Sequence, residues 1–109
     1  MYEIESGSRI VNNVRLTTYK REITNANIIS VEAGTTGLCG GDSGHGGRTY
    51  FRIDDLGGTC MYVNVDKNEY GDATGFEIEL EGDAELDTFI KALKFATKVL
   101  EDQKNEVYD

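Results

Sequence analysis

Apolar residues return every three or four positions between Leu86 and Leu100, near the end of the 109-residue chain. This period is typical of an amphipathic helix. Gly82 and Asp83 stand just before it, as a break and an N-cap. The pattern predicts a helix over about residues 83–104. It also predicts that one face of this helix packs on the core. The residues of that face are Leu86, Phe89, Ile90, Leu93, Ala96 and Leu100.

Three segments before the helix alternate apolar and polar residues, which is the pattern of a strand with one buried face. They are Phe76–Glu81, where every second residue is a carboxylate, and residues 59–66 and 48–54. The link Asp54–Gly58 contains two aspartates and two glycines. It therefore predicts a hairpin turn between the last two strands.

Two more strands are expected upstream, at Val14–Lys20 and Asn27–Glu32, and Tyr2–Glu5 adds a sixth at an edge. These elements predict an α+β fold, in which an antiparallel meander of five or six strands packs on one C-terminal helix. No linker or repeat divides residues 1–109, so a single domain is expected. The sheet face opposite the helix is left for a ligand or a second subunit, and a homo-oligomer through this free sheet face is the corresponding expectation.

Hydrophobic residues at 39% and charged residues at 28% are typical of a globular domain. The net charge of −9 is unevenly spread. Residues 1–53 carry six basic and five acidic side chains, whereas residues 54–109 carry five basic and fifteen acidic ones. The acidic half disfavours general nucleic-acid binding, because that function needs a broad basic field.

Residues Met1–Glu5 lack the basic and apolar regions of a signal peptide, and no apolar run is long enough to cross a membrane. A cytoplasmic protein without a membrane partner is therefore expected. In that compartment Cys39 and Cys60 are expected as free thiols, with Cys60 packed at the start of a strand and Cys39 more exposed. Together with Asp42 and His45 these thiols lack the tight spacing of a zinc site, so no metal and no cofactor are predicted.

Seven glycines lie between Gly34 and Arg48, together with the only histidine of the chain. Successive glycines allow backbone N–H groups to converge on one anion, because no side chain stands in the way. Arg48 opens the next strand, and Tyr50 and Arg52 follow on the same face at a period of two. The segment predicts a site for a phosphate-bearing, nucleotide-like small molecule, formed by Thr35, Thr36, Gly40, Gly41, Ser43, His45, Gly46, Gly47, Arg48, Tyr50 and Arg52.

Arg48 is the residue expected to hold the anion most directly. A guanidinium at the start of a rigid strand can make a bidentate contact with a phosphate while glycine amides hold its other oxygens. The alternative is that Arg48 pairs with a carboxylate such as Glu32 and braces two strands.

A catalytic role fits the same loop less well. Gly41–Gly44 spells Gly-Asp-Ser-Gly, the string around the nucleophile of chymotrypsin-like proteases. Serine chemistry needs a base and a third group that orients the base. His45 lies two residues from Ser43, but only Asp42 is near enough in sequence to orient it. We therefore predict no catalytic residue, with a Ser43/His45 hydrolase as the minor alternative.

Residues 31–37 and 40–50, VEAGTTG and GGDSGHGGRTY, resemble segments of small uncharacterised proteins of bacteria and their phages. The resemblance covers residues 28–54 and implies no activity. By its size and acidity alone, the chain is similar to phage anti-defence proteins. That similarity implies two functions. One is a sponge that holds a nucleotide signal without breaking a bond, and the other is an inhibitor that binds a basic protein through the carboxylates of residues 66–87.

Overall fold

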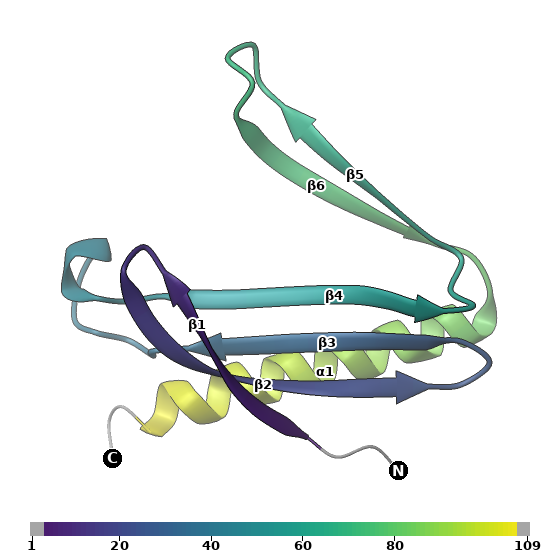
Figure 1. Ribbon diagram of the computed structural model, residues 1–109, viewed down its shortest axis with the longest axis horizontal. Helices are drawn as coiled ribbons and strands as arrows, with labels where there is room; N and C mark the ends of the chain where they lie inside the picture. The colour runs from purple at the N-terminus through teal and green to yellow at the C-terminus, as the bar shows by residue number, and fades with distance from the viewer. Residues whose placement is uncertain (1–3, 107–109) are drawn as a thin grey trace.

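The computed structural model describes residues 4–106 of the chain (Figure 1). Its fold is α+β, as predicted, with six antiparallel strands and one C-terminal helix. In chain order the elements are β1 (Glu5–Val11), β2 (Val14–Thr24), β3 (Ile28–Thr35), the 3-10 turn η1 (Ser43–His45), β4 (Thr49–Gly57), β5 (Met61–Lys67), β6 (Ala73–Leu80) and α1 (Asp83–Glu106). Among the described residues, no helix is both long and apolar enough to span a bilayer.

Four strands form the main sheet in the order β1-β2-β3-β4, and each pairs antiparallel with the next. Asn12 and Asn13 make the tight β1–β2 turn with φ of 45° and 70°, a conformation that asparagine tolerates better than most residues. α1 packs along β3 and β2 on one face of this sheet. β5 and β6 pair with each other in a separate hairpin that projects away from the sheet (Figure 1). We call residues 61–80 the arm.

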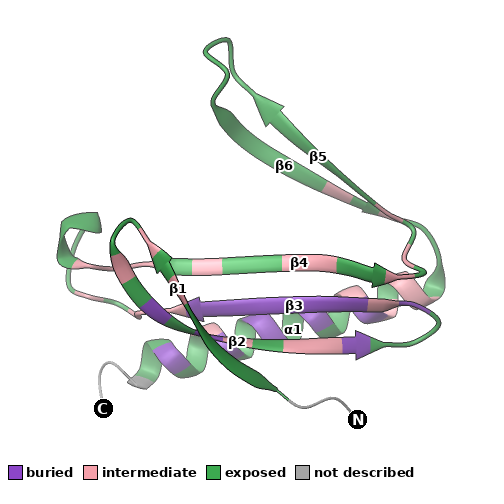
Figure 2. Ribbon diagram, viewed as in Figure 1, coloured by how far each residue is buried: buried purple, intermediate pink, exposed green. Residues whose placement is uncertain are grey.

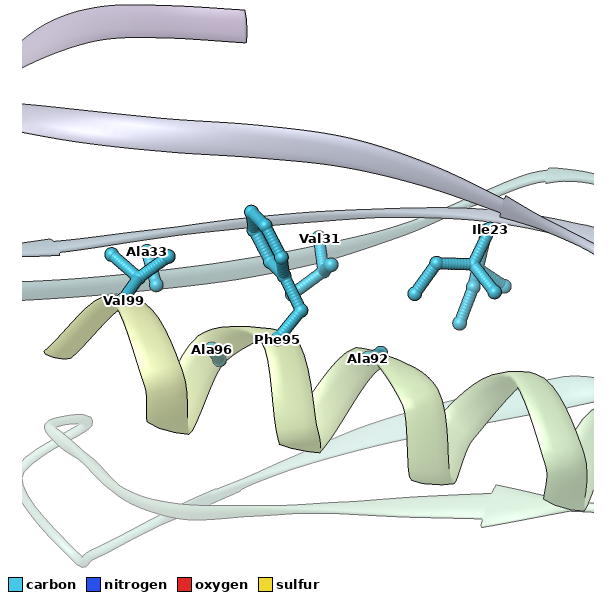
Figure 3. Close-up of a cluster of buried hydrophobic side chains, with 8 residues drawn as sticks. Ile23, Val31, Ala33, Ala92, Phe95, Ala96 and Val99 are labelled. Atoms are coloured by element: carbon cyan, nitrogen blue, oxygen red, sulfur yellow. The ribbon is translucent and has the colours of Figure 1, made fainter. Parts of the chain in front are cut away.

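The core lies between β3 and α1. Ile29, Val31 and Ala33 of β3 are at most 1% exposed, and they pack against two alanines and two larger side chains of the helix (Figure 3). The alanines let the helix approach the sheet closely, while Phe95 and Val99 fill the remaining space. Burial therefore concentrates along β3, the central strand that α1 covers (Figure 2).

The helix begins at Asp83, as predicted, but the predicted core face was only partly right: Ala96 is buried and Leu100 packs against the core, whereas three of the leucine and isoleucine positions are open. Leu86, Ile90 and Leu93 are 57%, 41% and 43% exposed. The helix is apolar over a wide arc. The periodicity of the sequence identifies this arc, but it does not determine which part of the arc contacts the sheet. The alanine side of the arc allows the closer approach, and the helix residues buried against the sheet are Thr88, Ala92, Phe95, Ala96, Val99 and Gln103.

The predicted hairpin between residues 48–54 and 59–66 was also wrong. Asp54 to Gly57 belong to β4, which continues its pairing with β3 as far as Gly57. The partner of β5 is β6, so the arm is separate from the main sheet.

Two smaller expectations changed as well. Of the predicted edge strand, Tyr2 and Glu3 lie outside the described residues, and the edge strand that is described begins at Glu5. Cys39 and Cys60 are free thiols as expected, but Cys60 is exposed and Cys39 is half-buried. Their order of exposure is the reverse of the prediction, because Cys60 lies in the open link before the arm.

Candidate functional site

The glycine-rich loop between β3 and β4 is closed at its base by its own hydrogen bonds. The Thr36 amide donates to the Arg48 carbonyl at 2.9 Å, and the Arg48 amide donates to Thr36 Oγ1 at 2.9 Å. Thr35 Oγ1 donates to the same Arg48 carbonyl at 3.0 Å. The two threonine hydroxyls that were predicted to contact a ligand therefore hold the loop together.

The Arg48 side chain braces the loop against the β1–β2 turn. Its guanidinium donates to four carbonyl oxygens, at distances of 2.9 to 3.2 Å, which belong to Val11, Asn12, Ser43 and Gly47. Four of the five guanidinium N–H groups are thus occupied. This conformation does not offer the bidentate fork expected from the sequence, and the ligand contact of Arg48 stays a prediction.

The tip of the loop is the single turn η1. Asp42 caps it, because its Oδ1 accepts from the Gly44 amide at 2.9 Å, and Gly46 ends it with φ of 87°. Asp42 Oδ1 also lies 3.3 Å from His45 Nδ1, whereas no hydrogen bond joins His45 to Ser43 within residues 4–106. A serine nucleophile needs contact with its base. The described conformation therefore lacks the contact that the hydrolase alternative requires.

Donors without internal partners gather at the outside of this tip. The amides of Gly40, Gly41 and Ser43 donate to no acceptor among residues 4–106. A side chain on Gly41 would collide with the His45 ring, so the ring packs this closely only against a glycine and would have to move aside for a larger residue. The tip is exposed and presents its amides to solvent.

Tyr50 and Arg52 lie on the sheet face opposite α1, as the alternation predicted. The Arg9 guanidinium stands 4.9 Å from the centre of the Tyr50 ring, within the range of a cation–π contact. Arg52 Nε donates to Asp54 Oδ2 at 2.8 Å, and this carboxylate raises the pKa of Arg52. Both predicted ligand residues therefore have partners within the chain.

Glu32 is a buried charge on the same face, with 6% of its surface exposed. Its carboxylate accepts from Arg9 Nε at 3.0 Å and Nη2 at 2.6 Å, and from Thr18 Oγ1 at 2.6 Å. The Arg9 contact lowers the pKa of Glu32, with a smaller contribution from Thr18, although burial acts in the opposite direction. The predicted alternative partner for Arg48 was therefore wrong, because Glu32 pairs with Arg9.

The predicted ligand residues do not line one pocket. Thr35 and Thr36 border a depression of 410 Å³ beside Gln103. The glycine tip lies at the outer end of its loop, and Tyr50 and Arg52 lie on the free sheet face. The structure thus divides the predicted site into three places.

A cavity of about 640 Å³ forms a groove between β2 and α1. Tyr19, Phe95 and Val99 supply its apolar surface. Its remaining lining residues are Ile4, Arg21, Lys91, Lys94, Lys98, Asp102 and Gln103. We call this cavity the β2–α1 groove. Four cations against one carboxylate make it a basic site on a chain of net charge −9.

Two of these cations lack a carboxylate partner. Lys91 pairs with Asp87, and Lys98 pairs with Asp102, each at 3.0 Å. Arg21 and Lys94 form no salt bridge within residues 4–106. Arg21 Nε is buried and has no hydrogen-bond acceptor in this part of the chain. A buried guanidinium nitrogen without an acceptor is unusual in proteins. Because solvent does not reach Nε, an anion in the groove would contact the two Nη groups of Arg21 together with Lys94.

Sequence reasoning missed this groove. The spacing of Lys91, Lys94 and Lys98 signals a basic flank on the helix, but nothing local in the sequence indicates that this flank borders a cavity. Arg21 lies seventy residues earlier in the chain. Only the packing of α1 beside β2 brings the strand cation and the helix cations to one cavity.

Within residues 4–106, no three His, Cys, Asp or Glu side chains come together as a metal site would require. The fold and the groove define a small α+β domain with a basic, partly apolar cavity. Comparisons with protein families, with curated proteins and with solved structures found no match to this chain.

Proposed function

We propose that this chain is a non-enzymatic binding protein for a small anionic molecule with a flat apolar part, such as a nucleotide, and that the ligand lies in the β2–α1 groove. The observation that supports this proposal is that Arg21 and Lys94 line the groove and form no salt bridge in the described part of the chain. A phosphate oxygen is the kind of acceptor that a guanidinium contacts best.

The size and chemistry of the groove fit such a ligand. Its volume of about 640 Å³ lies within the usual range of small-molecule sites. Tyr19 and Phe95 offer aromatic surface for a base, while Arg21 and Lys94 offer free positive charge for phosphates. A protein that holds a nucleotide signal in this way, and leaves its bonds intact, acts as a sponge.

Calorimetry and thermal-shift measurements with ATP, a cyclic dinucleotide and ADP-ribose test the proposal, with uncharged adenosine as the control ligand. At least one anion should bind and adenosine should not. Lys94→Ala should weaken binding by about tenfold or more, the effect of losing one charged hydrogen bond. Lys104→Ala removes a lysine from the same helix outside the groove and should leave affinity unchanged. Mass spectrometry after denaturation should recover the ligand intact.

Two results would argue against a ligand site in the β2–α1 groove. Failure of all anions to bind, or equal affinity in the Lys94→Ala and Lys104→Ala variants, would contradict a ligand in the groove. Binding that survives Lys94→Ala and is lost in Ser43→Ala would move the anion to the glycine tip. The free amides of Gly40, Gly41 and Ser43 favour that second location.

A second candidate function is inhibition of a basic protein through the acidic segment of residues 66–87. Asp66, Glu77 and Glu79 are exposed on one face of the arm, which gathers negative charge where a partner can reach it. Glu77→Lys combined with Glu79→Lys should then abolish the salt-sensitive retention of a basic protein that the unmodified chain binds. Retention of the same protein by both forms would contradict this candidate.

A further inference from the structure

One face of the arm is apolar and uncovered. The register pairs Val63 with Ile78 and Val65 with Phe76, so these four side chains share a face. Val63, Val65 and Phe76 are 53%, 56% and 64% exposed. The other face carries Tyr62 and the carboxylates described above. Figure 2 shows the arm as exposed over most of its length. An amphipathic hairpin of this kind needs a surface to cover its apolar face, since an isolated two-stranded hairpin is only marginally stable in water.

The arm also makes the molecule too extended for a chain of this length. The radius of gyration is 15.5 Å, and the principal extents are 43, 41 and 17 Å. A compact domain of this length has a radius of gyration of about 13 Å. Within the described residues, the arm makes no substantial contact with the main sheet or with α1. Its apolar face is therefore not covered by its own chain.

The direction of the arm is fixed at its base. Asn27, which is 1% exposed, donates from Nδ2 to Thr59 Oγ1 at 2.9 Å and to Thr88 Oγ1 at 3.0 Å. The Cys60 amide donates to Glu85 Oε2 at 3.4 Å. These contacts tie the link before β5 to the start of β3 and the first turns of α1.

A second exposed apolar surface lies on the part of the molecule formed by the main sheet and α1. Lys91, Lys94 and Lys98 face the β2 side of α1, so the opposite flank of the helix is turned toward β4. Phe51 and Ile53 of β4 project to the helix side, because they pair with the core residues of β3. α1 itself lies along β3 and β2, which leaves this flank open. We call this surface the β4–α1 strip, and its members are Phe51, Ile53, Leu86, Phe89, Ile90 and Leu93.

We infer that the arm of one copy of this chain covers the β4–α1 strip of a second copy, in a reciprocal dimer. In a two-fold symmetric dimer, the same arm–strip contact occurs twice, so the apolar face of the arm and the β4–α1 strip are covered in both chains. The dimensions agree, because the apolar face of the arm extends about 7 Å along its strands, from Val63 to Val65, and the helix part of the strip extends about 10 Å, from Leu86 to Leu93.

This interface differs from the one expected from the sequence. The free sheet face carries the Arg9–Glu32 pair and Arg52, so it is rich in charge. Seven of the exposed large apolar side chains lie on the apolar face of the arm and on the β4–α1 strip instead: Val63, Val65, Phe76, Phe51, Leu86, Ile90 and Leu93.

Light scattering coupled to size-exclusion chromatography tests the inference. The unmodified chain has a mass of 12.0 kDa and should elute with twice that mass. Phe76→Asp on the arm and Leu93→Asp on the strip should each elute as a folded monomer, because both side chains are exposed in a single copy. Tyr62→Asp is the matched control: it places the same charge on the other face of the arm, where Tyr62 is 54% exposed, and should remain a dimer. Circular dichroism verifies that every variant is folded.

A mixture of the two monomeric variants separates this interface from an arm-to-arm contact. The Leu93→Asp chain keeps an intact arm and the Phe76→Asp chain keeps an intact strip, so the mixture should form a heterodimer through one arm–strip contact. No dimer in the mixture, with Phe76→Asp folded, would overturn the arm–strip pairing. A mass of 12.0 kDa for the unmodified chain would overturn the dimer. A dimer that persists in both aspartate variants would place the interface elsewhere.

Discussion

Replacing Gln103 by leucine should destabilise the fold, because this residue joins the end of α1 to the sheet. Its Oε1 accepts from the Thr35 amide at 2.9 Å, and its Nε2 donates to the Thr17 carbonyl at 2.9 Å. Gln103 is only 8% exposed, so leucine retains the burial but removes both bonds. Each backbone group left without a partner costs about 1–3 kcal/mol, and the lower end applies where water has partial access.

The expected loss is about 2 kcal/mol, against a typical total stability of about 5–15 kcal/mol. A loss of this size lowers the Tm by roughly 10 °C in a domain of this length. Thermal and urea unfolding followed by circular dichroism measure it, at one protein concentration so that association does not shift the comparison. Lys104→Leu, at the exposed neighbouring position, is the control and should change stability by less than about 0.5 kcal/mol.

Gln103→Glu adds a pH test of the same contacts. A glutamate can accept from the Thr35 amide, but its second oxygen must keep a proton to donate to the Thr17 carbonyl. Burial and this contact both raise the pKa of the glutamate in the folded state. Relative to the unmodified chain, the contribution of this glutamate to stability should therefore be greatest below the unfolded pKa of about 4.3 and should be lost as the pH rises through the folded pKa. An unchanged Tm in Gln103→Leu, or a pH profile of Gln103→Glu that matches the unmodified chain, would refute the role of the glutamine.

Three further results are expected. Glu32→Gln should reduce the loss of stability in acid. Arg9 lowers the pKa of Glu32, so this pair stabilises the fold above the unfolded pKa, and the contribution is lost as the pH falls through the folded pKa. Equal acid profiles of the two chains in urea unfolding would argue against this role. Phe95→Ala should cost about 3–5 kcal/mol by leaving a cavity in the core, and an unchanged unfolding midpoint would show that the helix does not pack as described. Arg48→Lys should loosen the glycine loop, since lysine cannot reach four carbonyls at once. The change should speed amide hydrogen exchange at Gly44 and Gly46. Unaltered exchange would contradict the role of Arg48 in holding the loop against the β1–β2 turn.

The sequence alone determined the elements and their class. Alternation in residues 76–81 and a period of three to four from Leu86 onward specify a strand and a helix, because each backbone geometry has its own period. Both elements are found where they were predicted, as β6 and α1. Alternation also placed Tyr50 and Arg52 on one face of β4.

What the sequence left undecided was the direction in which each periodic face points. Leu93 and Ala92 lie in the same helix, and only the fit of alanine against β3 decides that Ala92 is buried and Leu93 is open. Strand pairing is equally nonlocal. The turn residues between β4 and β5 fit a hairpin of these two strands, but β4 pairs with β3 instead.

The candidate site depends on tertiary structure for the same reason. Arg21 becomes part of a basic groove only because α1 lies beside β2, and Arg48 contacts backbone carbonyls only because the β1–β2 turn reaches the glycine loop. A side chain carries its chemistry in the sequence, but its partners are set by the packing of elements that lie far apart along the chain. Local periodicity contains no information about that packing, so the groove and the open strip appear only in the folded molecule.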